Sequence, residues 1–142
     1  MSETLTQFGT SFQSKIIASL LRDVKFIQTI SDILNPPMFD SDSNKWLVKT
    51  VKDYYIKYKK QPTLEVIKYK MDEIDDDVLK SGVVDKLREV WKNIEATDLE
   101  FVQEQTLDFC KNQTLKGAIL ESVNLLENKD YDGIKSIIDE AM

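Results

Sequence analysis

One amphipathic stretch, enclosed by prolines on both sides, constrains the fold of this chain more than any other feature. The stretch covers residues 43–60, and two prolines precede it at 36–37 while a third follows at 62. Its apolar side chains recur at the spacing of one helix face, and they are Leu47, Val51, Tyr54, Tyr55 and Tyr58. Because proline disfavours helix in the preceding residue and lacks a backbone donor, both ends are marked. We therefore predict a central helix around which the other elements pack.

The same periodicity predicts further helices before and after the central one. Helical patterns begin at Ser11, after Asp23, after Thr63 and near Val83, with Asp23 and Thr63 as the expected N-caps. Residues 1–10 are polar and are expected to be loosely ordered. Phe39, between two helical stretches, is expected to anchor the linker in the core. With four glycines and three prolines in 142 residues and no alternating apolar runs, the sequence predicts an all-α fold.

A long uninterrupted helix is predicted from Leu99 to about Glu127, and its apolar face changes direction. In its first half one side carries apolar or small residues, namely Leu99, Val102, Thr106, Phe109 and Cys110. In its second half the apolar side is rotated about the helix axis by roughly a third of a turn, and it carries Leu115, Ile119, Val123 and Leu126. A helix that changes its buried face has changed its packing partner.

The partner expected for the second half is the last helix of the chain. A turn signal at 128–130 is followed by Asp130 or Asp132 as a possible cap, and then by an apolar face that includes Ile134, Ile137 and Ile138. We therefore predict a globular multi-helix head over residues 1–97 and an antiparallel helical hairpin over residues 98–142. Two helices bury little surface by themselves, so the hairpin is expected to find a partner beyond the head.

Charge and composition exclude several functional classes. The net charge of −6 argues against a stand-alone nucleic-acid binder, which should be basic. The chain contains no histidine, which removes the commonest general base and zinc ligand, and no nucleophile–base pair or phosphate-binding glycine motif is visible.

The single cysteine, Cys110, is expected to be a buried apolar side chain in a reducing compartment. Without a signal peptide or an apolar run long enough to span a bilayer, we expect a cytoplasmic protein and no membrane partner.

Two local motifs have a possible functional meaning and a simpler structural one. The spacing Asp40-x-Asp42-x-Asn44 matches the start of a calcium loop, but Lys45 replaces the required glycine and Val51 the final glutamate, so helix capping is favoured. The run from Tyr54 to Lys60 interleaves tyrosines and lysines, as single-strand binders do. On a helical wheel its tyrosines fall in the core stripe, and we therefore expect packed rings and solvated lysines.

The order and spacing of several motifs resemble the N-terminal domain of DnaB-type replicative helicases, and of phage members in particular. The segments that carry this resemblance are Ile16–Asp23, which ends in Leu-Leu-x-Asp, Phe26-Ile27, Leu34–Phe39, Asp53–Tyr55, Lys59–Thr63 and the ending 128–141. Together they cover nearly all of residues 11–142. The resemblance implies a helical head followed by a helical hairpin.

In that family these domains form a two-tier collar on a hexameric ring through head–head and hairpin–hairpin contacts. The collar also docks primase and helicase-loader proteins. A RecA-like motor follows it, binds ATP and Mg²⁺, and moves on single-stranded DNA. These 142 residues contain no such motor, so no cofactor, metal or catalytic residue is expected in this chain, and ATP hydrolysis would belong to the missing part. If the source is a phage, the location would be the host cytoplasm.

The sequence thus predicts a collar domain that serves self-association, as a dimer or a ring, and partner docking in DNA replication. The candidate interface consists of apolar positions on the hairpin: Leu115, Ile119, Val123, Leu126, Ile134, Ile137 and Ile138. The alternative is a stand-alone adaptor or loader-like protein that binds a helicase. An enzyme of unknown chemistry and a small-molecule binder are further alternatives.

Overall fold

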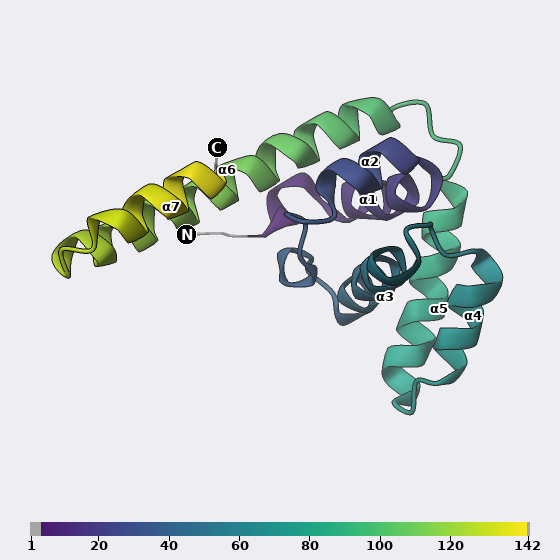
Figure 1. Ribbon diagram of the computed structural model, residues 1–142. Coiled ribbons are helices and arrows are strands. Elements are labelled where there is room, and N and C mark those ends of the chain that lie inside the picture. Colours follow the sequence, from purple (N-terminus) through teal and green to yellow (C-terminus); the bar gives the residue numbers. More distant parts are fainter. Residues whose placement is uncertain (1–3, 142) are drawn as a thin grey trace. The chain divides into compact units, whose positions relative to one another are not determined.

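The computed structural model describes residues 4–141, and within them it contains helices and no strands (Figure 1). The elements are η1 (Leu5–Phe8), α1 (Thr10–Arg22), α2 (Val24–Ile30), η2 (Pro36–Met38), α3 (Asp42–Tyr58), α4 (Leu64–Asp72), α5 (Asp77–Lys92), α6 (Leu99–Glu127) and α7 (Tyr131–Ala141). The all-α prediction is confirmed. The chain divides into two compact units at Thr106/Leu107, inside α6, whereas the predicted boundary after residue 97 falls in the turn before α6.

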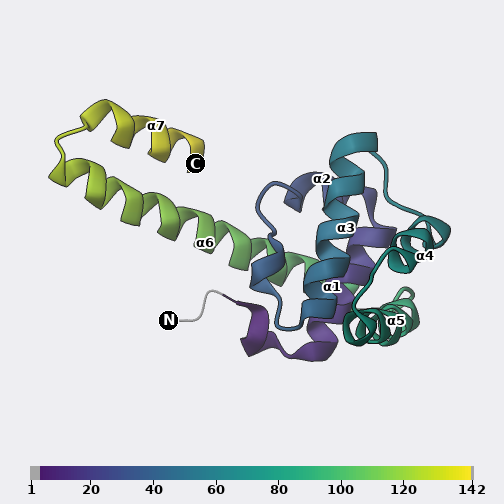
Figure 2. The same ribbon diagram turned by 90° about the horizontal axis from the view of Figure 1, so that it is seen from below.

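Helix α3 is the centre of the first unit, which we call the head. Its N-terminus is capped by Ser41, whose Oγ accepts a hydrogen bond from the backbone N–H of Asn44 at 3.0 Å. Leu47, Val48 and Val51 are fully buried along the helix. α3 contacts α1, α5 and η2, and the views in Figures 1 and 2 show these elements surrounding it. The stretch between the prolines therefore organises the head as predicted.

The last turn of α3 departs from the prediction that its tyrosines are packed. Tyr58 is 52% exposed, and its ring lies 4.6 Å from that of Tyr54, with Lys57 Nζ 5.2 Å from the Tyr58 ring centroid. Helical periodicity identifies the side of a helix that faces the core, but it does not say how far the neighbouring helices extend along it. The prediction that Tyr58 belongs to the core was wrong for this reason.

Side chains mark the starts of α4 and α5. Thr63 caps α4 through the N–H of Val66 at 3.2 Å, as predicted. Asp76 caps α5 by accepting from two backbone N–H groups, so α5 begins at Asp77 and not near Val83 as predicted. The first turn of α5 is solvent-exposed, and it therefore has no apolar periodicity from which a start could be predicted.

The linker between α2 and α3 is anchored as the sequence predicts. α2 ends at Ile30, well before the prolines, which form the short helix η2. Phe39 follows directly and is only 1% exposed. The N-terminal residues differ from the expectation of loose order, because Leu5 in η1 is fully buried; residues 1–3 lie outside the described part of the chain.

A buried glutamine joins η1, α1 and α3. The Gln13 amide donates to Asp40 Oδ2 at 2.8 Å and to the Leu5 carbonyl at 3.4 Å. Its carbonyl oxygen accepts from the Asp40 N–H at 3.1 Å and from Asn44 Nδ2 at 3.3 Å. All four hydrogen-bonding positions of this fully buried amide are therefore used, which is what makes its burial tolerable.

Acid should weaken this network through Asp40. Hydrogen bonds from Thr6 and then Gln13 lower the pKa of Asp40 below its ordinary value of 3.8. Because the folded-state pKa is lowered, the stabilisation is complete above the unfolded-state pKa and is lost as the pH falls through the folded-state value. We expect the wild type to lose more stability than Asp40→Asn on going from pH 4 to about pH 2, measured by urea unfolding at each pH. Equal losses would contradict a role for Asp40 ionisation.

Two ion pairs link the middle and the C-terminal end of α1 to the segment that precedes α6. Lys15 Nζ lies 2.7 Å from Asp98 Oδ2, and Arg22 Nη1 lies 2.8 Å from Glu95 Oε2. Arg22 Nη1 also donates a hydrogen bond to the Ile94 carbonyl. The hydrogen bond from Lys15 lowers the pKa of Asp98. Apart from the Lys15 side chain these groups are about half exposed or more, so the pairs specify the path of the chain more than they stabilise it.

Candidate self-association surface

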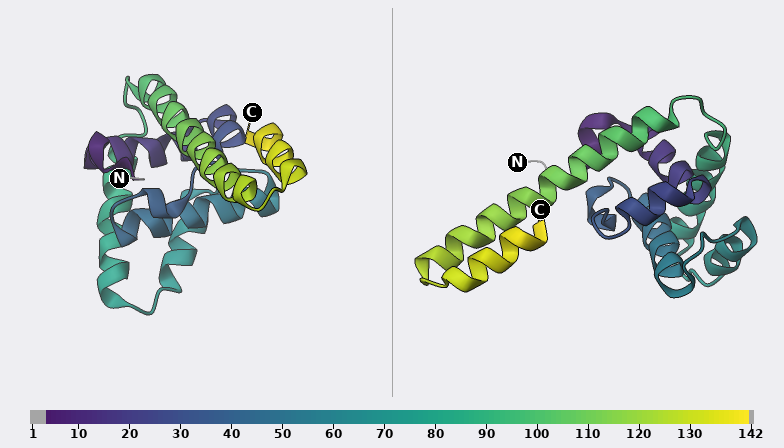
Figure 3. Two further views of the ribbon diagram at one scale, coloured as in Figure 1. Left: turned by 90° about the vertical axis from the view of Figure 1, so that its left-hand side faces the viewer. Right: turned by 45° about the horizontal axis from the view of Figure 1, so that its top comes forward.

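The second unit contains the C-terminal half of α6 and the helix α7, joined by a tight turn (Figure 3). The turn is a Schellman motif: the Asp130 N–H donates to the Leu125 carbonyl at 2.8 Å and the Lys129 N–H to the Leu126 carbonyl at 3.0 Å. Lys129 adopts the left-handed conformation that the motif requires, with φ of 59°. Of the two predicted caps, Asp130 is the one used, because its Oδ1 accepts from the Gly133 N–H at 2.9 Å.

After this turn, α7 runs back beside the second half of α6 (Figures 2 and 3). The less exposed positions on α6 recur at i, i+4 and i+7, and those on α7 at i, i+3 and i+7, so each set lies on one helix face. They are Ala118, Ser122 and Leu125 on α6, and Ile134, Ile137 and Ala141 on α7. We infer that these two faces line the contact between the helices, with small residues on α6 allowing close approach.

The large apolar stripe of α6 lies on another side. Leu115, Ile119, Val123 and Leu126 are each between 44% and 56% exposed. Their arc is centred roughly a quarter of a turn away from the Ala118 face. The sequence led us to expect that this stripe packs on α7, whereas the less exposed positions of this half of α6 lie on the neighbouring face.

Of the seven predicted interface residues, five are exposed and two are half-buried. Ile138 on α7 is 43% exposed, close to the exposed fractions of the four α6 residues. Ile134 and Ile137 are half-buried on the face turned to α6. We call the five exposed residues, Leu115, Ile119, Val123, Leu126 and Ile138, the hairpin apolar surface.

Sequence reasoning missed two exposed residues of this unit. Leu120 and Tyr131 are both more than 60% exposed. Leu120 follows Ile119 directly and therefore falls 100° away from it, outside the stripe that the wheel selects. Tyr131 is the first residue of α7 and lies between two aspartates, a position typical of a solvated helix start.

The C-terminal unit has little core of its own. None of the described residues of α7 is buried, and the buried residues in this part of α6 are Phe109, Cys110 and Ala118. Cys110 is buried, as the sequence led us to expect. A cluster of exposed large apolar side chains on one surface commonly marks a site of protein–protein contact. The arrangement can bind another apolar surface.

Among residues 4–141 no group of three or more His, Cys, Asp or Glu side chains is placed to bind a metal ion. In the same range, none of the helices combines the length and the hydropathy needed to cross a bilayer. Comparisons with protein-family models, with curated proteins and with solved structures found no match.

Proposed function

We propose that this chain is an oligomerisation and docking domain of a replicative DNA helicase, corresponding to the collar that precedes a ring-forming motor. The observation that carries the proposal is the hairpin apolar surface, which is exposed on a unit with almost no core of its own. The all-α fold is the one that the resemblance implies, and the helicase part of the proposal rests on that resemblance. The role is assembly: this surface would pair with a second copy, while the head would offer docking positions for primase or a loader.

A second copy is a suitable partner because the surface is apolar on both helices. Residues 107–141 contain seven carboxylates and four lysines, so the surroundings of the patch do not complement themselves electrostatically. Association would therefore be driven by burial of the apolar side chains, at roughly 25 cal/mol per Å² of area removed from water. A two-fold arrangement would bring the same patch of both copies together.

The expected result is a mass that rises with concentration. Light scattering during size-exclusion chromatography should give the mass of a single chain in dilute solution and that of a dimer or larger assembly at high concentration. The physical reason is that exposed apolar surface on two copies is removed from water only when they meet. A mass that stays at that of one chain over the whole soluble range would contradict self-association.

The alternative, an adaptor that binds a helicase without being part of one, is supported by the same exposed surface. The reading frame downstream of the Met142 codon discriminates between the two proposals. An in-frame motor with a phosphate-binding GxxxxGK[ST] loop supports the collar. A stop codon at that position would contradict the collar and favour the adaptor.

A further inference from the structure

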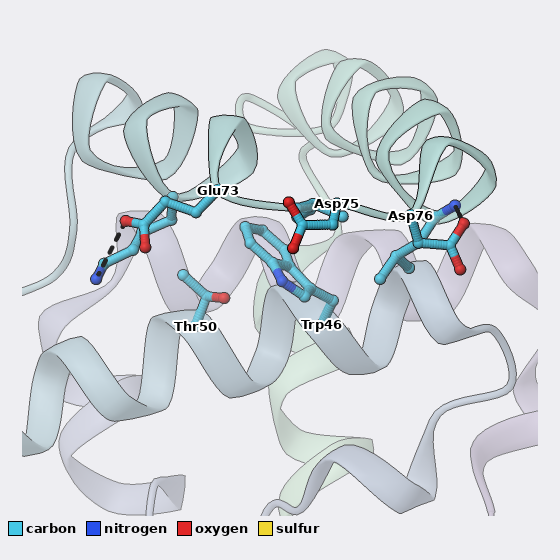
Figure 4. Close-up of a pocket in the computed structure, with 8 residues that line it drawn as sticks. Trp46, Thr50, Glu73, Asp75 and Asp76 are labelled. Carbon is cyan, nitrogen blue, oxygen red and sulfur yellow. Dashed lines mark hydrogen bonds and ion pairs between the residues drawn. The ribbon is translucent and has the colours of Figure 1, made fainter.

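The head contains a pocket that the proposed assembly does not use. It lies between α3, the end of α4 and the start of α5, and has a volume of about 380 Å³. Its lining residues are Trp46, Thr50, Lys70, Glu73, Ile74, Asp75, Asp76 and Leu79. Figure 4 shows the Trp46 indole standing in the pocket from α3, with Thr50 one turn further along and Asp75 next to the ring. The pocket therefore combines an aromatic wall with a carboxylate at its mouth.

The charges around the pocket are unequal. Three carboxylates and one ammonium line it. Lys70 Nζ lies 3.9 Å from Glu73 Oε1, so this cation already faces one of the acids. Asp76 accepts hydrogen bonds from the N–H groups at the start of α5. Asp75 makes no hydrogen bond or ion pair within the described residues, and it is exposed. One carboxylate beside the aromatic ring is therefore available to a ligand.

We propose that this pocket binds an arginine side chain in a basic segment of a partner protein. A guanidinium can stack on the face of a tryptophan while its N–H groups donate to a neighbouring carboxylate, and Trp46 and Asp75 provide both contacts from adjacent elements. The acidic net charge of the whole chain, −6, favours the approach of a basic partner. This assignment deepens the docking part of the proposed function and rests on it.

Arginine fits this site better than other cations for a geometric reason. The planar guanidinium offers a flat face to the indole and paired donors to the carboxylate, whereas the ammonium of lysine is a compact, strongly hydrated charge. Citrulline has the same planar shape as arginine without the charge. The site should therefore rank arginine above lysine and both above citrulline.

The two tryptophans of the chain make the test specific. Each gives one indole N–H signal in a two-dimensional ¹H–¹⁵N spectrum, and Trp91 lines a different pocket, beside Leu64 and Glu95. The probe is Nα-acetyl-arginine amide, titrated into the whole chain. The Trp46 signal should shift saturably in the millimolar range, and the Trp91 signal should stay in place. Substitution Trp91→Phe assigns the two signals.

Matched variants separate recognition from general electrostatics. Asp75→Asn should weaken arginine binding roughly fivefold, as expected for loss of one ion pair at a half-open site. Asp77→Asn makes the same change of net charge at an exposed neighbour outside the pocket lining, and it should leave the affinity within about twofold. A lack of saturable shift at Trp46, an equal response to acetyl-citrulline amide or acetyl-lysine amide, or equal effects of both variants would overturn the proposal.

The proposals of self-association and of arginine binding can be contradicted independently of each other. The mass measurement concerns the C-terminal unit, and the titration follows a side chain of the head. If the chain stays monomeric and its Trp46 signal shifts with arginine, the collar proposal is contradicted and the arginine site is supported. If the chain associates and its Trp46 signal does not shift, the arginine site is contradicted and the collar proposal is supported.

Discussion

Replacing Phe39 with alanine should lower the free energy of unfolding of the head by about 3–5 kcal/mol. The ring follows the two prolines of η2 and is only 1% exposed, so its removal leaves a cavity that the rigid Pro36-Pro37 backbone cannot easily fill. The loss would be a large fraction of the stability of a domain of this size. Urea unfolding followed by tryptophan fluorescence measures it, because both Trp46 and Trp91 lie in the head.

Met38 provides the matched control for this substitution. It precedes Phe39, is only half-buried, and is the last residue of the short helix η2. Met38→Ala should cost about 1–2 kcal/mol, in proportion to its smaller buried area. If the two variants lose the same stability, Phe39 does not act as the anchor of this linker.

Introducing charge into the hairpin apolar surface should abolish self-association. Ile119 and Val123 lie one turn apart on α6 and are both exposed in the single chain. Because the residues are exposed, Ile119→Asp with Val123→Asp should leave the chain folded. In an assembly both side chains would be buried, and burying an unpaired carboxylate is strongly unfavourable. Losing their apolar contribution alone should raise the dissociation constant by about 100-fold or more.

The control for this pair is an equally exposed apolar residue of the same helix in the head. Phe101 is 58% exposed, and Phe101→Asp should leave the dissociation constant within about threefold of the wild type. Sedimentation velocity of the three proteins at equal concentration gives the comparison, and circular dichroism verifies that each is helical. Unchanged association in the double variant, or its loss in Phe101→Asp, would place the interface elsewhere.

The sequence was sufficient for features that depend on local chemistry. Asp23 and Thr63 cap helices because their side chains reach N–H groups three residues ahead, a contact that is encoded within a few positions. Phe39 was predictable as an anchor because a large aromatic side chain in a short linker between helices can be removed from water only by packing into the core that these helices form. The all-α class follows from the same kind of local pattern repeated along the chain.

Features that depend on distant partners were not predictable. Gln13 is polar and lies within an amphipathic helix, and nothing near it in the sequence indicates that Leu5, Asp40 and Asn44 satisfy its amide. The exposure of Tyr58 depends on where its neighbouring helices end.

The same limit applies to the candidate site and to the pocket. Periodicity located the apolar stripe of α6, but it could not show that the less exposed positions of this helix would lie on the face beside the stripe. The proximity of Trp46 and Asp75 depends on how α3 packs against the loop between α4 and α5, and hydropathy does not report this.

The central claim, that two copies meet at the hairpin apolar surface, is tested most directly by isotope-filtered nuclear Overhauser spectroscopy. A sample that mixes ¹³C-labelled and unlabelled chains, at a concentration at which the mass exceeds that of one chain, reports only contacts between copies. We expect intermolecular cross-peaks from the methyl groups of Leu115, Ile119 and Val123. A spectrum in which the intermolecular cross-peaks come from methyl groups of the head alone would contradict the claim.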